Sequence, residues 1–258
     1  MIRRSSILKV FLGSFFLQAS WSFEKMQGLG FAAAISPAIK DVFNGGGPFV
    51  SAIRRHLAFY NAHPYMTSPV LGASIRLEEK GRNGECPVDA GARLKTMVMG
   101  PYGALGDSFF WGSVRPLASC LGVLSAVLWG LWGILVFLAV YNVFHLWMRW
   151  DGLMKGYRLG EGVIGYVKSL ELPKWSIRLR YVSAAVLGVF FAIAAFNLSE
   201  RGVMVRHLKY PYAWISAGII LAFASVVFLN IFFKRGITVT RLVYIVIVPL
   251  ILLGVIFR

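Results

Sequence analysis

Hydrophobic residues are unevenly distributed along the chain, and the second half contains long stretches without charge. No Asp, Glu, Lys or Arg occurs from Pro116 to Met148, whereas about 20 apolar residues are enough for one membrane-spanning helix. This stretch therefore predicts either one long tilted helix or a broken pair, with Gly130 and Gly133 as possible breaks. Three more uncharged stretches of spanning character follow, over 181–198, 210–233 and 242–257.

The first half of the chain is less apolar and is interrupted by Pro and Gly. Helices are predicted over 49–60 and 70–79, and a polar loop is predicted over 80–91. A glycine-rich apolar segment, 97–114, comes next and contains a single acid, Asp107. Irregular backbone at membrane depth is tolerated only where it is buried in protein or lines a cavity. The first half is therefore the better place to look for a functional site.

These patterns predict an all-α, polytopic integral membrane protein in two parts. Residues 1–115 are expected to form broken or re-entrant helices and hairpins, beginning with an amphipathic helix. Residues 116–258 are expected to form regular transmembrane helices.

The N-terminal residues resemble a secretory signal peptide, with two arginines followed by an apolar stretch. Lys9 interrupts that stretch, and the bulky Leu17 and Trp21 flank the position where cleavage would occur. The helical pattern also continues as far as Phe31. We therefore expect a retained, partly buried amphipathic helix.

Composition and charge agree with a membrane protein. The chain is 57% hydrophobic and 15% charged, with a mean hydropathy of +0.67, whereas soluble domains have about 25% charged residues. A net charge of +16 would suit a nucleic-acid binder, but the basic residues lie outside the uncharged stretches. Seven of them crowd 149–180 beside three acids, which predicts a cytoplasmic loop near 149–180. We therefore interpret the charge as a signal of topology and a docking face for lipid headgroups or soluble partners, with no nucleic acid.

Motifs of several enzyme classes are missing from the sequence. There is no Walker A motif, no HExxH, no CxxC and no GxSxG. The two cysteines, Cys86 and Cys120, have no metal-ligand spacing. We expect neither a metal nor another cofactor, and no catalytic residue on this chain.

Polar residues in apolar surroundings mark three candidate segments in the first half. Glu24 and Gln27 lie beside Trp21, Asn61 and His63 form a polar break before Pro64, and Asp107 and Arg115 bracket an aromatic stretch that contains Trp111. An ionisable residue in such a place is a functional-site hypothesis by default.

Each candidate also has a structural interpretation. Asp107 would pair with Arg115, and Glu24 would pair with Lys25 or face water. His63 would be a turn residue satisfied by backbone groups, and the tryptophans would be packing or interface aromatics. His145 has no visible partner in the sequence.

Four ordered blocks between residues 18 and 116 carry a family resemblance. They are QASWSFEKMQGLGF from Gln18, RHLAFYNAHPYM from Arg55, LEE from Leu77 with Asn83-Gly84 after it, and MGP from Met99 leading into GDSFFWGSVRP. The chain resembles the IID subunits of mannose/fructose/sorbose-type phosphotransferase-system (PTS) sugar permeases.

The resemblance implies a transport subunit of the bacterial inner membrane. Such a IID subunit pairs with a IIC membrane subunit to carry a hexose or amino-hexose, and a cytoplasmic IIB subunit, supplied by IIA, phosphorylates the sugar on release. The family also implies a trimer of IIC/IID pairs. The phosphoryl transfer then belongs to partner subunits, and this chain is not an enzyme.

The resemblance also implies roles for the residues that match the blocks. Gln18, Gln27 and Asn61 would bind sugar hydroxyls, because amides both donate and accept hydrogen bonds. Trp21 or Trp111 would stack on a sugar face, and His63 would contact substrate without carrying phosphate. Structural or gating roles fall to a further set, Glu24, Asp107 and Arg115, the last two holding the glycine-rich segment as a hairpin.

Some features depart from the family and leave alternatives open. Ser22 and Lys25 stand where the family usually has Asn and Arg, and only residues 199–209 connect two spans where many members carry a long insertion. One alternative is a non-transporting membrane scaffold or assembly protein. The other is a stand-alone proton-coupled secondary transporter that uses Glu24 and Asp107.

Overall fold

The computed structural model describes residues 2–201, with the side chains of 192 and 194–201 left out. The expected spans at 210–233 and 242–257 lie outside the described residues. Contacts divide the chain into two units, Met1–Ala192 and Ile193–Arg258, and the following description concerns the first unit.

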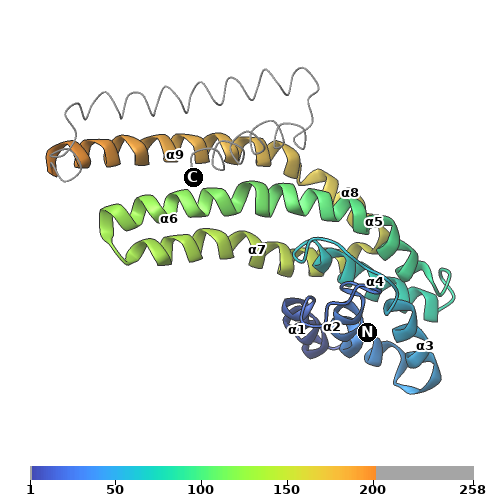
Figure 1. Cartoon of the computed structure of the whole chain (residues 1–258). Helices are drawn as coiled ribbons and strands as arrows, with labels where there is room; N and C mark the ends of the chain where they lie inside the picture. The colour runs from blue at the N-terminus through green and yellow to red at the C-terminus, as the bar shows by residue number, and fades with distance from the viewer. Residues whose placement is uncertain (1, 202–258) are drawn as a thin grey trace, which may run out of the picture. The chain divides into compact units, whose positions relative to one another are not determined.

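Within the described residues the chain is helical, and its only β-type pairing consists of two isolated bridges. The all-helical prediction is confirmed for this part. The elements in chain order, shown in Figure 1, are α1 (Arg4–Gly13), η1 (Ser14–Phe16), α2 (Gly28–Phe43), α3 (Gly46–His56), α4 (Thr67–Arg82), α5 (Ala90–Gly106), η2 (Asp107–Val114), α6 (Arg115–Trp129), α7 (Trp132–Leu159), η3 (Gly160–Gly162), α8 (Val163–Ser169) and α9 (Leu172–Arg201).

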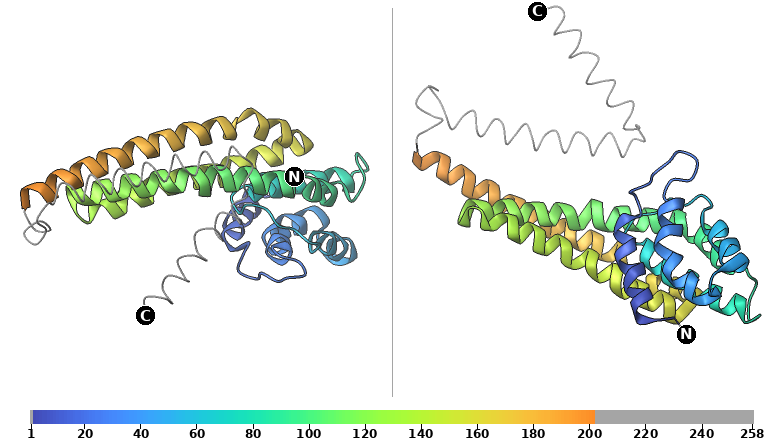
Figure 2. Two further views of the ribbon diagram at one scale, coloured as in Figure 1. Left: turned by 45° about the horizontal axis from the view of Figure 1, so that its top comes forward. Right: turned by 90° about the horizontal axis from the view of Figure 1, so that it is seen from below.

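The helices α5, η2 and α6 follow one another without interruption, and η2 is a π-helix. Gly130, at φ +64°, ends α6, and α7 returns antiparallel beside it (Figures 1 and 2). The uncharged stretch 116–148 is therefore a broken pair with its break at Gly130. Gly133 lies inside α7, where it packs closely against Gly122.

Two helical segments in the described part are long and apolar enough to cross a membrane, Ala90–Trp129 and Trp132–Phe191. Their extents differ from the predicted ones in two places. Most of the expected loop at 149–180 is helical, formed by the end of α7, then η3, α8 and the start of α9. The expected hairpin at 97–114 is also wrong, because these residues continue one helix, which runs on across residue 115.

The N-terminal helix also differs from its prediction. It ends in η1 at Phe16 and does not continue to Phe31. Gly30 of α2 lies so close to the Leu17 carbonyl that a Cβ there would overlap it. Residues 17–27, between η1 and α2, form an irregular connection in which Met26 has a φ of +49°.

The helix α4 packs along α7 at small residues. Gly72 of α4 contacts the Leu153 carbonyl, while Gly152 and Gly156 of α7 contact Pro69. Added Cβ atoms at Gly72 or Gly156 would fall well inside van der Waals distance of backbone oxygens. The two backbones approach this closely only because those side chains are absent.

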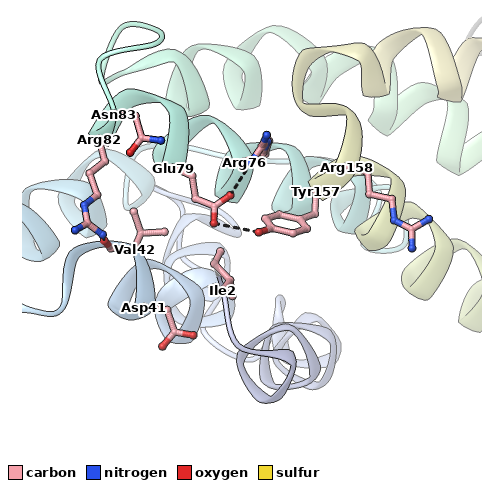
Figure 3. A pocket seen from close by; sticks show the side chains of 9 residues that line it. All are labelled: Ile2, Asp41, Val42, Arg76, Glu79, Arg82, Asn83, Tyr157 and Arg158. Atoms are coloured by element: carbon pink, nitrogen blue, oxygen red, sulfur yellow. Dashed lines mark hydrogen bonds and ion pairs between the residues drawn. The ribbon is translucent and has the colours of Figure 1, made fainter.

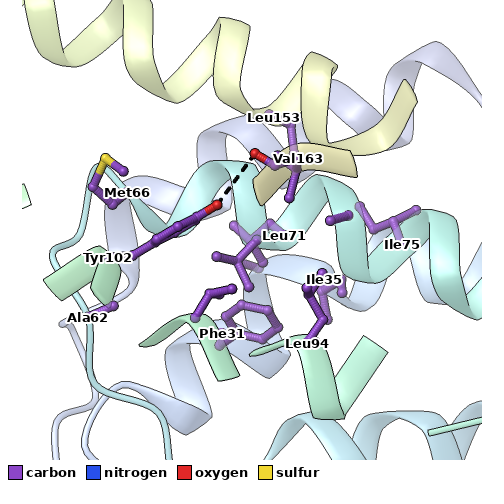
Figure 4. Close-up of a cluster of buried hydrophobic side chains, with 14 of the residues drawn as sticks. Phe31, Ile35, Ala62, Met66, Leu71, Ile75, Leu94, Tyr102, Leu153 and Val163 are labelled. Carbon is purple, nitrogen blue, oxygen red and sulfur yellow. Dashed lines mark hydrogen bonds between the residues drawn. The ribbon is translucent and has the colours of Figure 1, made fainter. Parts of the chain in front are cut away.

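A polar cleft opens where α2, α4 and α7 end, and Figure 3 shows its side chains. Beside this cleft, the helices enclose a large cluster of buried hydrophobic side chains. Figure 4 shows part of this core, in which Phe31 and Ile35 of α2, Leu71 of α4, Leu94 of α5 and Leu153 of α7 lie together. The Tyr102 side chain extends across this core, and its hydroxyl group donates a long hydrogen bond of 3.5 Å to the Val163 carbonyl oxygen.

We expect Gly72→Ala to destabilise the protein, because the new methyl group would push α4 away from α7. Overpacking of this kind costs about 1–3 kcal/mol, which is measurable as a lower midpoint of thermal unfolding in detergent. Gly165→Ala in α8 is the matched control, since nothing lies within 4 Å of its added Cβ. Helix propensity favours that control by up to about 1 kcal/mol. Equal midpoints for the two variants would contradict the close packing of α4 on α7.

Candidate functional site

Two irregular segments, 17–27 and 57–66, meet beside the buried core. Met26 forms an isolated bridge with Tyr60, and the Gln27 N–H donates to the Tyr60 carbonyl at 2.8 Å. The Tyr60 N–H donates back to the Lys25 carbonyl at 3.3 Å. The structure therefore brings together the first two segments that the sequence analysis selected.

Gln27 holds this pairing with its side chain. Its amide is 1% exposed, Nε2 donates to the Ala62 carbonyl at 2.8 Å, and Oε1 accepts from the Ala62 N–H at 3.3 Å. Both ends of the amide are thus used by the backbone next to Asn61. Asn61 itself is exposed, and its side chain has no hydrogen bond to the described residues.

The other polar residues predicted in the first segment point away from the core. Gln18, Trp21 and Glu24 are all exposed, and Trp21 retains 54% of its surface. Glu24 makes no ion pair with Lys25 or with any other cation in the part of the chain that the structure describes.

A network of buried charged side chains lies beside the second segment, 57–66, and bonds to its first residues. Glu78, 2% exposed, accepts from Arg55 at 2.7 Å and lies 3.0 Å from His56 Nε2. Lys95, fully buried, donates to the His56 and Ala58 carbonyls at 2.9 and 3.0 Å. Burial lowers the pKa of His56, although Glu78 opposes this shift. The network ties the end of α3 to α4 and α5.

His63 lies at the centre of an aromatic cluster. Its ring is 2% exposed, stacks on Phe110 at a centroid distance of 5.0 Å, and meets Trp111 edge-on at 5.0 Å. Its Nδ1 accepts from the Tyr65 N–H at 3.3 Å, which places the proton of a neutral ring on Nε2. Burial lowers the pKa of His63, with Arg149 adding to the effect, so the neutral form is favoured.

Tyr65 connects His63 to one face of α7. Its ring contacts Tyr141, stacks on His145 at 4.7 Å, and lies 4.9 Å from the Arg149 guanidinium. These three α7 residues are spaced by four positions, so they share one side of the helix. The hydroxyl groups of Tyr65 and Tyr141 are also hydrogen-bonded to each other at 2.8 Å.

Arg149 is a buried cation without a carboxylate partner among the described residues. It is 4% exposed, donates to the carbonyl oxygen and the hydroxyl of Ser14, and lies over the Phe15 ring at 4.6 Å. These contacts hold the first two residues of η1, which leads into the first irregular segment. Arg149 therefore joins α7 to both irregular segments.

Three buried nitrogens in this cluster have no hydrogen-bond partner in the described structure: His63 Nε2, His145 Nδ1 and Arg149 Nε. Asn142 Nδ2 donates to the Leu138 carbonyl, so its Oδ1 faces His145 Nε2, which donates to it at 2.6 Å. A neutral His145 then keeps Nδ1 as an acceptor. The unused groups are two donors and one acceptor, a combination that suits hydroxyl groups.

The third predicted segment forms the π-helix η2. Asp107 begins it and Arg115 follows it, but both are exposed and no ion pair joins them within the described residues. The predicted hairpin role of this pair is therefore wrong, because η2 is part of a continuous helix. Arg180 of α9 contacts η2 instead, through Ser113 at 3.2 Å and Ser108 at 3.0 Å. Trp111, 46% exposed, projects from η2 beside His63.

Sequence reasoning missed several members of this arrangement. In the sequence, Arg149 and Arg180 stand out only as topology signals, and His145 has no visible partner. One available signal was the spacing of Tyr141, His145 and Arg149, which places polar groups on one face of an apolar helix. Nothing in the sequence shows that this face meets Tyr65.

We expect Arg149→Met to lower the thermal unfolding midpoint, because the Ser14 groups lose their donor and two rings lose a cation. The cost should be about 1–3 kcal/mol, the usual penalty for a buried group left unpaired. Arg149→Lys keeps the charge without the planar fork and should be intermediate. Arg178→Gln, an exposed arginine on α9, is the control. A higher midpoint for Arg149→Met would mean that the desolvation of the cation outweighs its contacts.

Comparisons with known proteins agree on one family. The family model described as "PTS system mannose/fructose/sorbose family IID component" matches residues 1–257. The chain is 37% identical over 199 residues to the mannose-specific EIID component of Escherichia coli K12, covering 76% of this chain and 68% of that protein. It is 34% identical to the sorbose-specific EIID component of Klebsiella pneumoniae, covering 73% and 68%.

A third relative and two solved structures give the same result. The fructose permease IID component of Bacillus subtilis is 31% identical, covering 73% of this chain and 67% of that protein. A chain in the cryo-EM structure of the mannose transporter ManYZ with microcin E492 is 36% identical, with a TM-score of 0.59 over 73% of this chain and 70% of that one. A structure described as a membrane protein has the same identity and coverage, with a TM-score of 0.65. This chain belongs to the mannose/fructose/sorbose family of PTS IID components, which are membrane subunits of sugar permeases.

Proposed function

We propose that this chain forms, with a IIC subunit, the translocation path for a hexose or amino-hexose that a IIB subunit phosphorylates on uptake. IIA supplies the phosphoryl group to IIB, so the chemistry lies on partner chains. The observation that carries the proposal is the meeting of the irregular segments 17–27 and 57–66, which leaves an unpartnered Asn61 amide beside Gln27 and its backbone contacts.

The proposed sugar contacts follow from which groups remain unused. Asn61 and Gln18 offer exposed amides, and Trp21 and Trp111 offer exposed ring faces. His63 offers a single N–H at Nε2. We assign Gln27 a role in positioning Asn61, because its own amide is already bonded to Ala62. Glu24, Asp107 and Arg115 are exposed and remain candidates for gating contacts with the partner subunit.

The assembly that we propose is a multi-pass complex in the bacterial inner membrane, with three IIC/IID pairs. Exposed apolar side chains on α6, α7 and α9 support contact with lipid or with IIC. On the positive-inside rule, the basic residues of 149–180 face the cytoplasm, where IIA and IIB would act.

We expect Asn61→Ala to lower phosphoenolpyruvate-dependent phosphorylation of the transported sugar by about tenfold in kcat/KM, which corresponds to one hydrogen bond of about 1.4 kcal/mol. The measurement uses vesicles that contain this chain, its IIC partner and the soluble PTS proteins, with mannose as the first sugar. Ser169→Ala is the control, because Ser169 is exposed and, within the described residues, its hydroxyl donates only to the Tyr166 carbonyl.

Other outcomes would favour the alternative functions. Partner binding without any sugar phosphorylation would support a scaffold role. Uptake by this chain alone that collapses with the proton gradient would support a secondary transporter. Unchanged kcat/KM for Asn61→Ala would remove Asn61 from the proposed sugar contacts.

A further inference from the structure

The exposed side of α1 has no role in the proposed function, although it is strongly apolar. The buried side of this helix packs against α2. The opposite side carries Leu8 and Leu12, and η1 continues it with Phe15 and Phe16, all of which retain between 42% and 68% of their surface. Residues three and four positions apart are neighbours on a helix, so these four side chains form one stripe. We call it the α1 stripe.

Contacts with α7 show where the α1 stripe lies relative to the uncharged stretch 116–148. Ile2, just before α1, lines the polar cleft together with Tyr157 of α7 (Figure 3). Further along the chain come two ring contacts, at centroid distances of 5.2 and 6.2 Å, which are Phe11 with Trp150 and Phe15 with His145. The helix α1 therefore proceeds from the basic end of α7 toward its uncharged part. The apolar end of the stripe lies where α7 is expected to enter the membrane.

Exposed tryptophans mark the same level of α7. Trp150, which contacts Phe11, is exposed, and so is Trp147 almost one turn earlier. Trp175 of α9 is exposed as well and lines an apolar groove together with Trp147. Tryptophan gathers at the boundary between headgroups and hydrocarbon, because its ring is apolar and its N–H group is polar. These three residues place that boundary at the part of α7 that α1 contacts.

The basic residues of α1 favour a lipid leaflet as the occupant over a protein partner. Arg4 begins the helix and Lys9 follows Leu8, and both are exposed. Neither is paired with an acid within the described residues. A protein partner would have to supply an apolar surface and two separate acids. A leaflet that contains anionic phospholipids supplies an apolar layer and many headgroups, so the two cations need not share one anion.

We propose that α1 and η1 lie in the membrane interface, on the side of the membrane where 149–180 emerges. The α1 stripe contacts the acyl chains of that leaflet, and Arg4 and Lys9 contact its anionic headgroups. An amphipathic helix in this position binds through buried apolar area and through attraction to anionic lipid. This role also accounts for the likeness of the N-terminus to a signal peptide, since both kinds of segment combine basic residues with an apolar stretch. The inference concerns lipid and does not depend on the proposed sugar contacts.

The first test identifies what covers the α1 stripe. The photoreactive residue benzoylphenylalanine replaces Leu12 in the complex of the full chain with its IIC partner, in vesicles of phosphatidylcholine and phosphatidylglycerol. We expect irradiation to attach a phospholipid to this chain, which mass spectrometry detects. The same replacement at Asn83, which is exposed beside the polar cleft, is the control and should attach no lipid. A cross-link from position 12 to IIC, or no lipid adduct beyond the control, overturns the proposal.

The second test concerns the headgroups. In nanodiscs, adding phosphatidylglycerol to phosphatidylcholine should raise the thermal unfolding midpoint of the wild type, and Arg4→Gln/Lys9→Gln should lose at least half of that rise. The control Lys40→Gln/Arg54→Gln removes the same charge at exposed positions of α2 and α3 and should keep the rise. Equal losses in the two variants, or no loss in either, overturn the proposed headgroup contacts. Neither test measures sugar phosphorylation, so failure here is distinct from failure of the proposed transport function.

Discussion

The close contact between α4 and α7 is the constraint on which the rest of this structure depends. Gly72, Gly152 and Gly156 allow the two backbones to approach around Pro69. The segment 57–66 ends where α4 begins. The contact between α4 and α7 therefore sets the position of this segment along the axis of α7. Tyr65 can then reach the face of α7 that carries His145 and Arg149. A side chain at any of the three glycines would separate these groups.

The site is built from segments that are not helical, and specific contacts keep them so. Gly30 packs on the Leu17 carbonyl, and Gln27 supplies two hydrogen bonds to Ala62. Helical residues would satisfy their own backbone groups, whereas irregular ones must find partners elsewhere. The side chains of Gln27 and Lys95 provide hydrogen-bond partners for the backbone of the second segment. The Asn61 side chain makes no hydrogen bond within the described residues.

Buried cations are a recurring feature of this fold. Lys95 is held by two carbonyl groups and faces the Phe31 ring at 5.1 Å, and Arg149 is held by Ser14 and two aromatic rings. Carbonyl oxygens and aromatic rings offset the cost of burial without an acid.

The sequence by itself determined the family and the helical class of the described part, and it selected the candidate segments. Uncharged stretches predict helices because a bilayer requires them, and Gly130 was already one of two expected breaks. Local pattern failed where a partner decides the outcome. Helical periodicity extends from Ile7 to Phe31, yet residues 17–27 are irregular and Gly30 of α2 packs on the Leu17 carbonyl. The sequence predicts that Asp107 and Arg115 form a pair, yet both are exposed at the ends of η2. Only the tertiary structure decided that Arg149 meets Tyr65, because this contact depends on how distant segments pack and leaves no local periodicity.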